Sequence, residues 1–227
     1  MADDAPLTWR DGVPVSTRFD DPYYSLSGGL EEARHVYLGG NDLPARLCDG
    51  FHVGELGFGT GLNLAALLMA ADGRFRLRYT TFEAFPMAVT DMRRALEQMG
   101  GAQVLEGLLA ALETGATVFE DAHLHFTLIK GDARKTLPTW SGRADAWFLD
   151  GFSPAKNPEM WSADLMAEVA RHTHVGGTAA TFTAARSVRD GLEGAGFEVT
   201  RAPGFGRKKH MTQAVLPARY SAASEIS

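Results

Sequence analysis

Apolar and polar positions divide most of the chain into short apolar runs separated by stretches with a helical period. An apolar run of about four to eight residues bounded by turn residues is typical of a buried strand. Strands are expected at 51–58, 76–85, 124–132, 144–152, 176–183, 197–204 and 210–217. Helices are expected between them at 62–71, 86–99, 158–172 and 184–195. The first helix, LNLAALLMAA, is apolar on every side, so it is expected to be buried.

Some boundaries carry signals of their own. Asn157 is a favoured N-cap residue for the helix at 158–172, with proline at the favoured first helical position. Residues 1–50 are less regular, with short strands expected around Val13–Phe19 and a helix from about Gly28. Residues 102–120 have a weak helical pattern and are a candidate insertion.

Strands that alternate with helices form βαβ units, which give a mostly parallel sheet with right-handed crossovers. Because no helix separates the last two strands, one of them should run antiparallel. We therefore expect an α/β fold with a mostly parallel seven-stranded sheet and one antiparallel strand over residues 51–220. Residues 1–50 are expected to form an N-terminal extension packed on this core. Ligands of such sheets bind beyond the carboxyl ends of the strands, where the strand order reverses.

The loop VGELGFGTGLN, residues 53–63, has features of a nucleotide site. A dinucleotide fingerprint, G-x-G-x-x-G, would need a third glycine where this chain has Leu62. Glu55 precedes the glycines and would repel a pyrophosphate resting on the helix N-terminus. S-adenosylmethionine has a sulfonium, an ammonium and a nucleoside without phosphates, so it is compatible with this acid. The loop therefore predicts S-adenosylmethionine as the cofactor.

Two further acids follow the next two strands. Glu83 comes 22 residues after Gly61 and could accept hydrogen bonds from both ribose hydroxyls. Asp132, in the sequence KGDAR, could accept from the adenine amino group. Either acid could instead cap the helix that follows its strand. Acids at three successive strand ends, counting Glu55, favour a nucleoside site.

The stretch WFLDGFSPAKNPEMW, residues 147–161, indicates the chemistry. Asp150 ends an apolar strand and precedes Gly-Phe-Ser-Pro, in which the proline disfavours an immediate helix. An acid on this turn could bind an amine acceptor and take up its proton, because an alkylammonium group titrates near ~10.4. The alternative is a turn or capping acid. Phe152 could stack on a base, whereas Trp147 is more typical of a core.

Composition limits the partners. The 227 residues carry a net charge of −6, one cysteine (Cys48) and no apolar run near the ~20 residues of a membrane span. Because the N-terminus is acidic and unlike a signal peptide, we expect a cytoplasmic protein.

The net charge disfavours nucleic-acid binding by bulk electrostatics, but RAPGFGRKKH (201–210) holds four basic side chains and no acid. Two pairs of histidines, His123 with His125 and His172 with His174, lack a third ligand at metal-site spacing, so no metal is expected. A monomer is expected because no surplus amphipathic helix is visible.

Several segments resemble the methyltransferase domain of bacterial tRNA wobble-uridine modification enzymes of the MnmC and MnmD type. They are DDPYYSLSGGLEEARHVYLGGNDLPARL, ELGFGTGLN, WFLDGFSPAKNPEMW, and GGTAATFTAARSVRDGLEGAGFEV followed by GFGRKKHM. The resemblance covers most of residues 20–214 and implies a class I, Rossmann-like methyltransferase fold. It also implies transfer of a methyl group from S-adenosylmethionine to the amine of 5-aminomethyl-(2-thio)uridine at the tRNA wobble position.

The resemblance further implies roles for individual residues. At the cofactor it implies Glu55, Gly57, Gly59 and Gly61 on the methionine side, Glu83 at the ribose and Asp132 at the adenine. Tyr24, Phe58, Thr60 and Asn63 are expected to complete the cofactor pocket. At the acceptor it implies Asp150 as the catalytic acid, Phe152 and Lys156 at the substrate, and Arg207, Lys208 and Lys209 near the tRNA backbone.

Other interpretations remain open from the sequence. A small-molecule N-methyltransferase is favoured by the acidic charge and disfavoured by the basic loop. A nicotinamide-dependent oxidoreductase is disfavoured by Leu62 and Glu55, and a non-catalytic binding module would not need an acid at the cofactor face. The two-domain relatives add a flavin oxidoreductase that uncovers the amine. This chain has no second dinucleotide fingerprint, so that activity, if needed, is expected from a separate protein.

Overall fold

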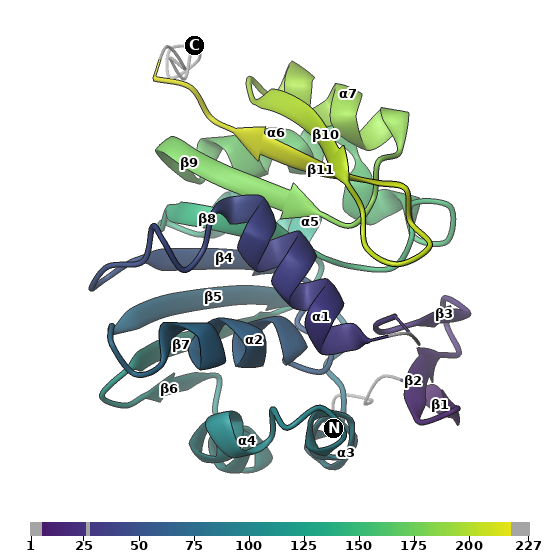
Figure 1. The fold of residues 1–227 in the computed structure, drawn as a ribbon, viewed down its shortest axis with the longest axis vertical. Coiled ribbons are helices and arrows are strands. Elements are labelled where there is room, and N and C mark those ends of the chain that lie inside the picture. The colour runs from purple at the N-terminus through teal and green to yellow at the C-terminus, as the bar shows by residue number, and fades with distance from the viewer. Residues whose placement is uncertain (1–5, 26–27, 219–227) are drawn as a thin grey trace.

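The computed structural model describes residues 6–25 and 28–218; the expected domain boundary at residue 220 lies outside them. Figure 1 shows the arrangement. The strands are β1 (Leu7–Arg10), β2 (Val13–Ser16), β3 (Asp21–Pro22), β4 (His52–Leu56), β5 (Leu77–Glu83), β6 (Val118–Glu120), β7 (Leu124–Lys130), β8 (Ala144–Leu149), β9 (Thr173–Thr181), β10 (Glu198–Pro203) and β11 (His210–Val215). The helices are α1 (Gly29–Ala33), α2 (Leu62–Ala71), α3 (Val89–Glu97), α4 (Glu106–Glu113), α5 (Ala133–Thr136), α6 (Ala163–Arg171) and α7 (Arg186–Gly194). Within the described residues, no helix has the length and apolar character needed to cross a membrane.

The central sheet has the strand order β10-β11-β9-β8-β4-β5-β7-β6. The strands β4, β5, β7, β8 and β9 pair in parallel, and β11 is antiparallel to both β9 and β10. The expected α/β fold, with a mostly parallel sheet and an antiparallel strand near its end, is confirmed. The structure adds an eighth strand, because β6 pairs antiparallel with β7 at the edge. This strand lies in the region 102–120 that was expected to be helical throughout; α4 is the helical part.

The strand order reverses at β4. From β4 the chain passes through β5 to β7 on one side, and then returns to β8 and β9 on the other. In parallel sheets the crevice outside the carboxyl ends of the strands at such a reversal binds ligands. The loops that follow β4 and β8 are therefore the segments that this topology assigns to a site.

The side chains of β8 alternate between the two faces of the sheet. Phe148 packs in the core formed with α1 and α2, whereas Trp147 packs in the core formed with α6 and α7. Figure 1 shows α1 and α2 in front of the sheet and α6 behind it. Both side chains are fully buried, so the expectation that Trp147 belongs to the core is confirmed.

The N-terminal segment adds a second small sheet and a helix to this framework. β1, β2 and β3 form an antiparallel sheet near the expected position of the short strands. α1 continues through a π-helical stretch at Arg34–Leu38. Leu30 of α1 and Val36 of the π-helical stretch belong to the same core as α2. π-Helical turns are frequent at functional sites, and this one carries Tyr37, which faces the cavity described below.

The helix expected from Pro158 starts later than its sequence indicates. Pro158–Trp161 form a 3-10 turn, and α6 begins only after Ser162. Asn157 makes no side-chain cap hydrogen bond, whereas the Ser162 hydroxyl accepts from the backbone N–H of Leu165 at 3.3 Å. The indole of Trp161 donates to the carbonyl oxygen of Phe152 at 2.9 Å. That bond ties the turn to the preceding loop instead of letting it continue in line with α6.

Gly54 in the centre of β4 tests how tightly the sheet packs. A Cβ at this position would lie 2.7–2.9 Å from ring atoms of Trp147. We expect Gly54→Ala to lower the free energy of unfolding by about 1–3 kcal/mol, because the buried ring has no space to move. Urea unfolding of Gly194→Ala is the matched control, since nothing lies within 4 Å of an added Cβ there. Equal midpoints for the two variants would contradict the proposed clash.

Candidate functional site

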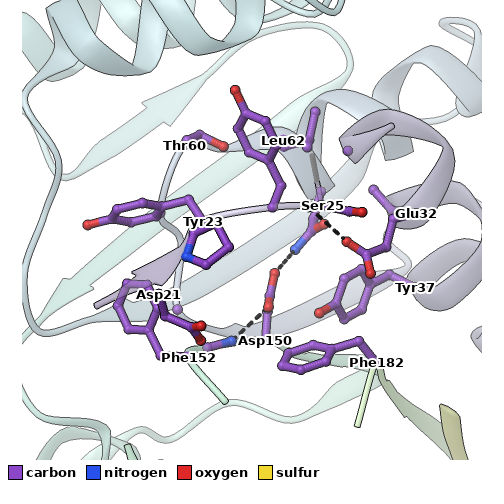
Figure 2. A pocket seen from close by; sticks show the side chains of 18 of the residues that line it. Asp21, Tyr23, Ser25, Glu32, Tyr37, Thr60, Leu62, Asp150, Phe152 and Phe182 are labelled. Carbon is purple, nitrogen blue, oxygen red and sulfur yellow. Dashed lines mark hydrogen bonds between the residues drawn. The ribbon is translucent and has the colours of Figure 1, made fainter. Parts of the chain in front are cut away.

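A cavity of about 510 Å³ lies at the carboxyl ends of β4 and β8. Its wall includes the loop after β4, the loop after β8, residues 21–25, part of α1, and the loop between β10 and β11. Figure 2 shows the side chains that surround it. The site is therefore built at the reversal of strand order and covered from both ends of the chain.

The glycine loop forms the floor between the two central strands. Gly57 and Gly59 have φ angles of 85° and 53°, in the left-handed region where a side chain is strained. A Cβ on Gly57 would also lie 3.2 Å from the carbonyl oxygen of Asp150. The glycine at position 57 thus lets the loops after β4 and β8 meet at their backbones. Phe58 and Thr60 line the cavity beside the glycines, whereas Gly61 lies outside its wall as the N-cap of α2.

Asn63 joins two carboxylates beneath this floor. Its side-chain Nδ2 donates to Glu55 Oε1 at 3.0 Å and to Asp150 Oδ2 at 2.8 Å. The other oxygen of Glu55 accepts from the hydroxyl of Thr81 at 2.9 Å. Glu55 is fully buried and is not part of the cavity wall, whereas Asn63 and Asp150 are. Glu55 therefore acts on the cavity through Asn63 and not by direct contact.

Asp150 is the carboxylate at the centre of the site. Burial raises its pKa to about 6, and hydrogen bonds from Asn63, from Tyr37 and from the backbone N–H of Gly151 oppose that rise. The Gly151 bond measures 2.7 Å. Burial also raises the pKa of Glu55 well above its ordinary range, with the nearby charge of Asp150 as a further cause. At neutral pH Asp150 is thus an anion that a cationic ligand would stabilise.

Glu83, at the end of β5, also faces the cavity. Its carboxylate accepts from the backbone N–H of Gly59 at 3.1 Å and from that of Phe85 at 2.7 Å. Burial raises the pKa of Glu83. On the covering side, burial raises the pKa of Tyr24 to about 12. Its hydroxyl is buried and has no hydrogen-bond partner among the described residues, although the ring lines the cavity.

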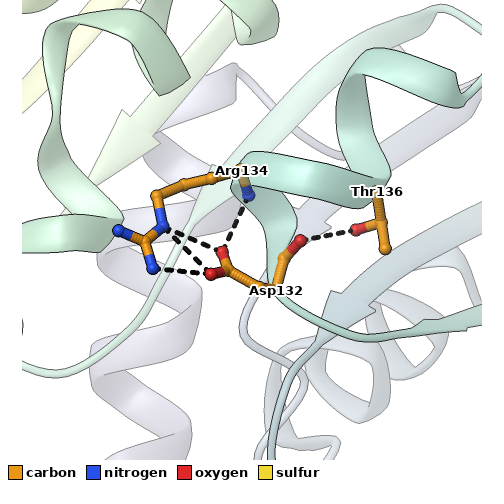
Figure 3. Close-up of polar contacts among 3 residues, drawn as sticks. All are labelled: Asp132, Arg134 and Thr136. Atoms are coloured by element: carbon orange, nitrogen blue, oxygen red, sulfur yellow. Dashed lines mark hydrogen bonds and ion pairs between the residues drawn. The ribbon is translucent and has the colours of Figure 1, made fainter.

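Asp132 does not join this group. It follows β7 and caps α5, where its carboxylate accepts from the backbone N–H of Arg134 at 3.0 Å (Figure 3). The guanidinium of Arg134 donates to both oxygens, with Nη2 to Oδ2 at 2.6 Å. These hydrogen bonds lower the pKa of Asp132. Asp132 is not in the cavity wall, and it makes the helix-capping contacts that were the alternative interpretation from sequence.

A cluster of aromatic rings at one side of the cavity includes two residues of its wall, Phe152 and Tyr23. Phe152 stacks on Phe19 with ring centroids 4.7 Å apart and meets the edge of Tyr23 at 5.1 Å. Figure 2 shows Phe152 and Tyr23 close to Asp21 on this side. The guanidinium of Arg18 lies 4.2 Å from the ring centroid of Phe85, next to Phe19. An aromatic wall with a cation at its edge suits a planar base.

Lys156 holds the loop after β8 to the N-terminal segment. Its ammonium donates to the carbonyl oxygen of Asp20 and lies 3.5 Å from a carboxylate oxygen of Asp21. The same carboxylate accepts from the backbone N–H of Ser153 at 2.8 Å. Lys156 was expected at the substrate; the structure gives it a clamping role outside the cavity wall.

The three basic residues of the loop between β10 and β11 occupy different environments. Arg207 and Lys208 line the cavity, whereas Lys209 is exposed and lies outside its wall. The ammonium of Lys208 donates to Glu32 Oε1 at 2.9 Å. Lys208 was expected near the tRNA backbone; in this structure it is paired with an acid of α1.

Sequence reasoning missed several residues of the cavity wall, among them Glu32 and Tyr37. Glu32 is a buried acid of α1; the buried Gly29 of this helix lies three residues before it, and the buried Val36 of the π-helical stretch lies four residues after it. That helical spacing was a usable signal. Tyr37 had none, because an aromatic residue on a helix usually belongs to the core. Among the described residues no group of three or more His, Cys, Asp or Glu could hold a metal ion.

Comparison with known proteins gives relatives along nearly the whole chain. The bifunctional protein MnmC of tRNA 5-methylaminomethyl-2-thiouridine biosynthesis from Caulobacter sp. strain K31 is 46% identical over 94% of this chain. The protein of the same name from Leptospira borgpetersenii is 41% identical over 95%. The matches span 38% and 35% of these two relatives, so the chain corresponds to about a third of their length.

Solved structures and a family model agree with these relatives. The crystal structure of MnmC2 from Aquifex aeolicus superimposes with a TM-score of 0.75 and 26% identity, covering 94% of this chain and 70% of that one. The family model described as S-adenosyl-L-methionine-dependent methyltransferase matches residues 95–217, more than half of the chain. This protein therefore belongs to the S-adenosyl-L-methionine-dependent methyltransferase family.

Proposed function

We propose that this enzyme transfers a methyl group from S-adenosylmethionine to the primary amine of 5-aminomethyl-(2-thio)uridine at the tRNA wobble position. The product would be 5-methylaminomethyl-(2-thio)uridine. The observation that carries the proposal is Asp150, a carboxylate with a raised pKa in the wall of the cavity that it shares with the glycine loop. The names of the relatives, which concern biosynthesis of this nucleoside, support the choice of acceptor.

The residues present fit the cofactor. S-adenosylmethionine supplies an electrophilic methyl group on a positively charged sulfur. The backbone of Gly57 and Gly59 leaves room for a close approach, and Glu83, at the carboxyl end of the neighbouring strand β5, supports a ribose contact. The orphaned hydroxyl of Tyr24 is a buried donor in the same wall, and a polar ligand atom would satisfy it. The cavity wall supports Glu83 rather than Asp132 at the nucleoside.

Asp150 would act on the acceptor. An alkylammonium group keeps its proton at neutral pH, so the amine must lose one proton before its lone pair can attack. Bound S-adenosylmethionine would supply the methyl group to the deprotonated amine nitrogen, and the electron pair of the broken carbon–sulfur bond would stay on the departing sulfur. Asp150 binds the ammonium, orients it and accepts the proton. Most of the remaining catalysis is positioning of the two reactants.

The environment of Asp150 supports this role. Asn63 and Tyr37 hold the carboxylate by hydrogen bonds, so its orientation is fixed before a substrate arrives. The rings of Phe152 and Tyr23, both in the cavity wall, offer a surface on which the uracil ring could stack. Arg207 in the cavity wall and the exposed Lys209 two residues further along the loop supply cations that could bind a phosphate backbone. A net charge of −6 makes such local contacts necessary.

A small-molecule amine is the alternative acceptor. The net charge favours it, whereas the cations of the loop between β10 and β11 favour tRNA. We further propose that the protein acts in the cytoplasm, and that a flavin oxidoreductase activity supplies the free amine where one is needed. We propose that the enzyme works as a monomer.

Mass spectrometry of wobble nucleosides tests the proposed function. Incubation of the enzyme with S-adenosylmethionine and tRNA carrying the free aminomethyl group should add one methyl group to that nucleoside. Asp150→Asn should lower the rate about 10²–10⁴-fold, the usual contribution of a general base, while S-adenosylmethionine binds with little change. Absence of the added methyl group with the unaltered enzyme would contradict the function. Loss of cofactor affinity in the variant would assign Asp150 to the cofactor pocket instead.

The pH dependence of transfer should reflect the titration of Asp150. Because burial raises its pKa to about 6, the carboxylate that binds ammonium is present above that value and is lost as the pH falls through it. We expect kcat/KM to fall about ten-fold per pH unit below about 6 and to level off above about 7. The Asp150→Asn profile should lack this limb. A flat profile for the unaltered enzyme between about pH 5 and 7 would rule out Asp150 as the titrating group.

Salt dependence tests the cations at the cavity mouth. Arg207→Glu and Lys209→Glu should each weaken tRNA binding and reduce the slope of log K against log salt by about one per lost phosphate contact. Filter binding over a range of salt concentrations measures this slope. Lys130→Glu is the matched control, because this exposed lysine ends β7 outside the cavity wall. An equal loss of slope in all three variants would mean that only overall charge matters.

A further inference from the structure

Glu32 and Lys208 form an ion pair in the wall of the cavity. The reaction proposed above does not use this ion pair. Glu32 Oε1 accepts from the ammonium of Lys208 at 2.9 Å, and Glu32 Oε2 accepts from the backbone N–H of Ser25 at 3.1 Å. The Lys208 ammonium also lies 4.0 Å from the ring centroid of Phe182. The two residues are 176 positions apart in the sequence, so the pair joins α1 to the loop between β10 and β11.

The loop that presents Lys208 is tightly folded. The backbone N–H of Lys208 donates to the carbonyl oxygen of Phe205 at 3.0 Å, and that of Gly204 donates to Lys209 at 3.1 Å. A Cβ at position 204 would lie 2.2 Å from the carbonyl oxygen of Lys208, so this position requires glycine. The backbone of this turn therefore fixes the position from which the Lys208 side chain enters the cavity wall.

Exposure is unequal within the pair. The side chain of Glu32 is 10% exposed, whereas that of Lys208 is 45% exposed. The carboxylate is therefore a fixed part of the wall, and the ammonium reaches it from the solvent side. A half-exposed ion pair is weak, so Lys208 can leave when another partner competes for it.

Together, the groups around the Lys208 ammonium make a site for a primary ammonium ion. A carboxylate oxygen and an aromatic face are the two partners that such a cation prefers. The site faces the same space as Asp150: the charge of Glu32 is one of the causes that raise the pKa of Asp150 and of Tyr37. Figure 2 shows Glu32, Tyr37, Asp150 and Phe182 on the same side of the cavity.

We propose that Lys208 occupies an entry subsite at Glu32 for the acceptor's primary amine, from which the amine passes to Asp150 in the same cavity, and that a polyanionic acceptor frees this subsite by drawing Lys208 onto a phosphate. The proposal rests on the amine acceptor proposed above. The acceptor ammonium takes the place of the lysine ammonium at Glu32, and the phosphate takes the place of Glu32 at Lys208. Charge is balanced on both sides of this exchange. A nucleoside without phosphates offers nothing to Lys208, so the pair selects tRNA over free nucleosides.

Binding of the free nucleoside 5-aminomethyluridine to enzyme loaded with S-adenosylhomocysteine tests the proposal. Calorimetry needs no turnover and compares the unaltered enzyme with Lys208→Met, Glu32→Gln and the double variant. Lys208→Met keeps an apolar chain against Phe182 while it removes the competing ammonium. Lys130→Met removes the same charge from an exposed site on β7 and serves as the control for net charge.

Lys208→Met should bind the nucleoside about five-fold more tightly than the unaltered enzyme, the size expected from a weak ion pair. The same variant should have a higher KM for tRNA, because one phosphate contact is lost. Glu32→Gln should bind the nucleoside more weakly, and the double variant should match Glu32→Gln. Opposite effects on the two acceptors distinguish an exchange from a structural role, which would impair both. Thermal midpoints check folding, and Lys208→Gln replaces the methionine variant if that one does not fold.

Unchanged or weaker nucleoside binding by Lys208→Met would overturn the exchange. A tighter double variant would also overturn it, because the gain would then not depend on Glu32. Methylation of tRNA by the unaltered enzyme is measured in parallel. If that methylation occurs and the nucleoside result fails, only the exchange is wrong; if it does not occur, the proposed function itself fails.

Discussion

The site depends on one side-chain amide that serves two buried carboxylates. An amide NH₂ has two hydrogens, and Asn63 uses them on Glu55 and Asp150. Without this donor each of the two acids would lose one of its hydrogen bonds, and each lost hydrogen bond to a buried charged group costs roughly 1–3 kcal/mol. Thr81 donates a hydrogen bond to the remaining oxygen of Glu55, so both oxygens of that acid have a protein partner and neither faces the cavity. Asp150 is left as the member of the pair that can respond to a ligand.

Much of the fold was predictable because its signals are local. Each parallel strand is an apolar run, and the helices follow at the spacing that βαβ units require. β6 was missed because an edge strand of three residues, exposed at Val118 and Glu120, has no apolar run to mark it. The start of α6 was misplaced for a different reason. The N-cap preference of Asn157 is real, but a tertiary hydrogen bond from Trp161 decides where the turn lies.

The site was predictable to the extent that strand ends determine it. Asp150 and Glu83 reach the cavity because parallel strands bring their carboxyl ends to one edge. Asp132 stands at an equivalent strand end, yet Arg134, only two residues away, takes up its carboxylate. No pattern along the chain distinguishes these outcomes. The pairing of Lys208 with Glu32 was beyond prediction from one sequence, because the two residues meet only after the whole chain has folded.

Two of the contacts that cover the cavity have a consequence for the order in which the protein folds. The hydrogen bond from Ser153 to Asp21 and the ion pair of Lys208 with Glu32 close loops of more than a hundred residues. Local βαβ contacts form with little loss of chain entropy, whereas such long loops pay the largest closure cost. The sheet can therefore assemble before the cavity has a cover. A ligand that binds under that cover contacts both the first and the last parts of the chain, so ligand binding favours the covered form.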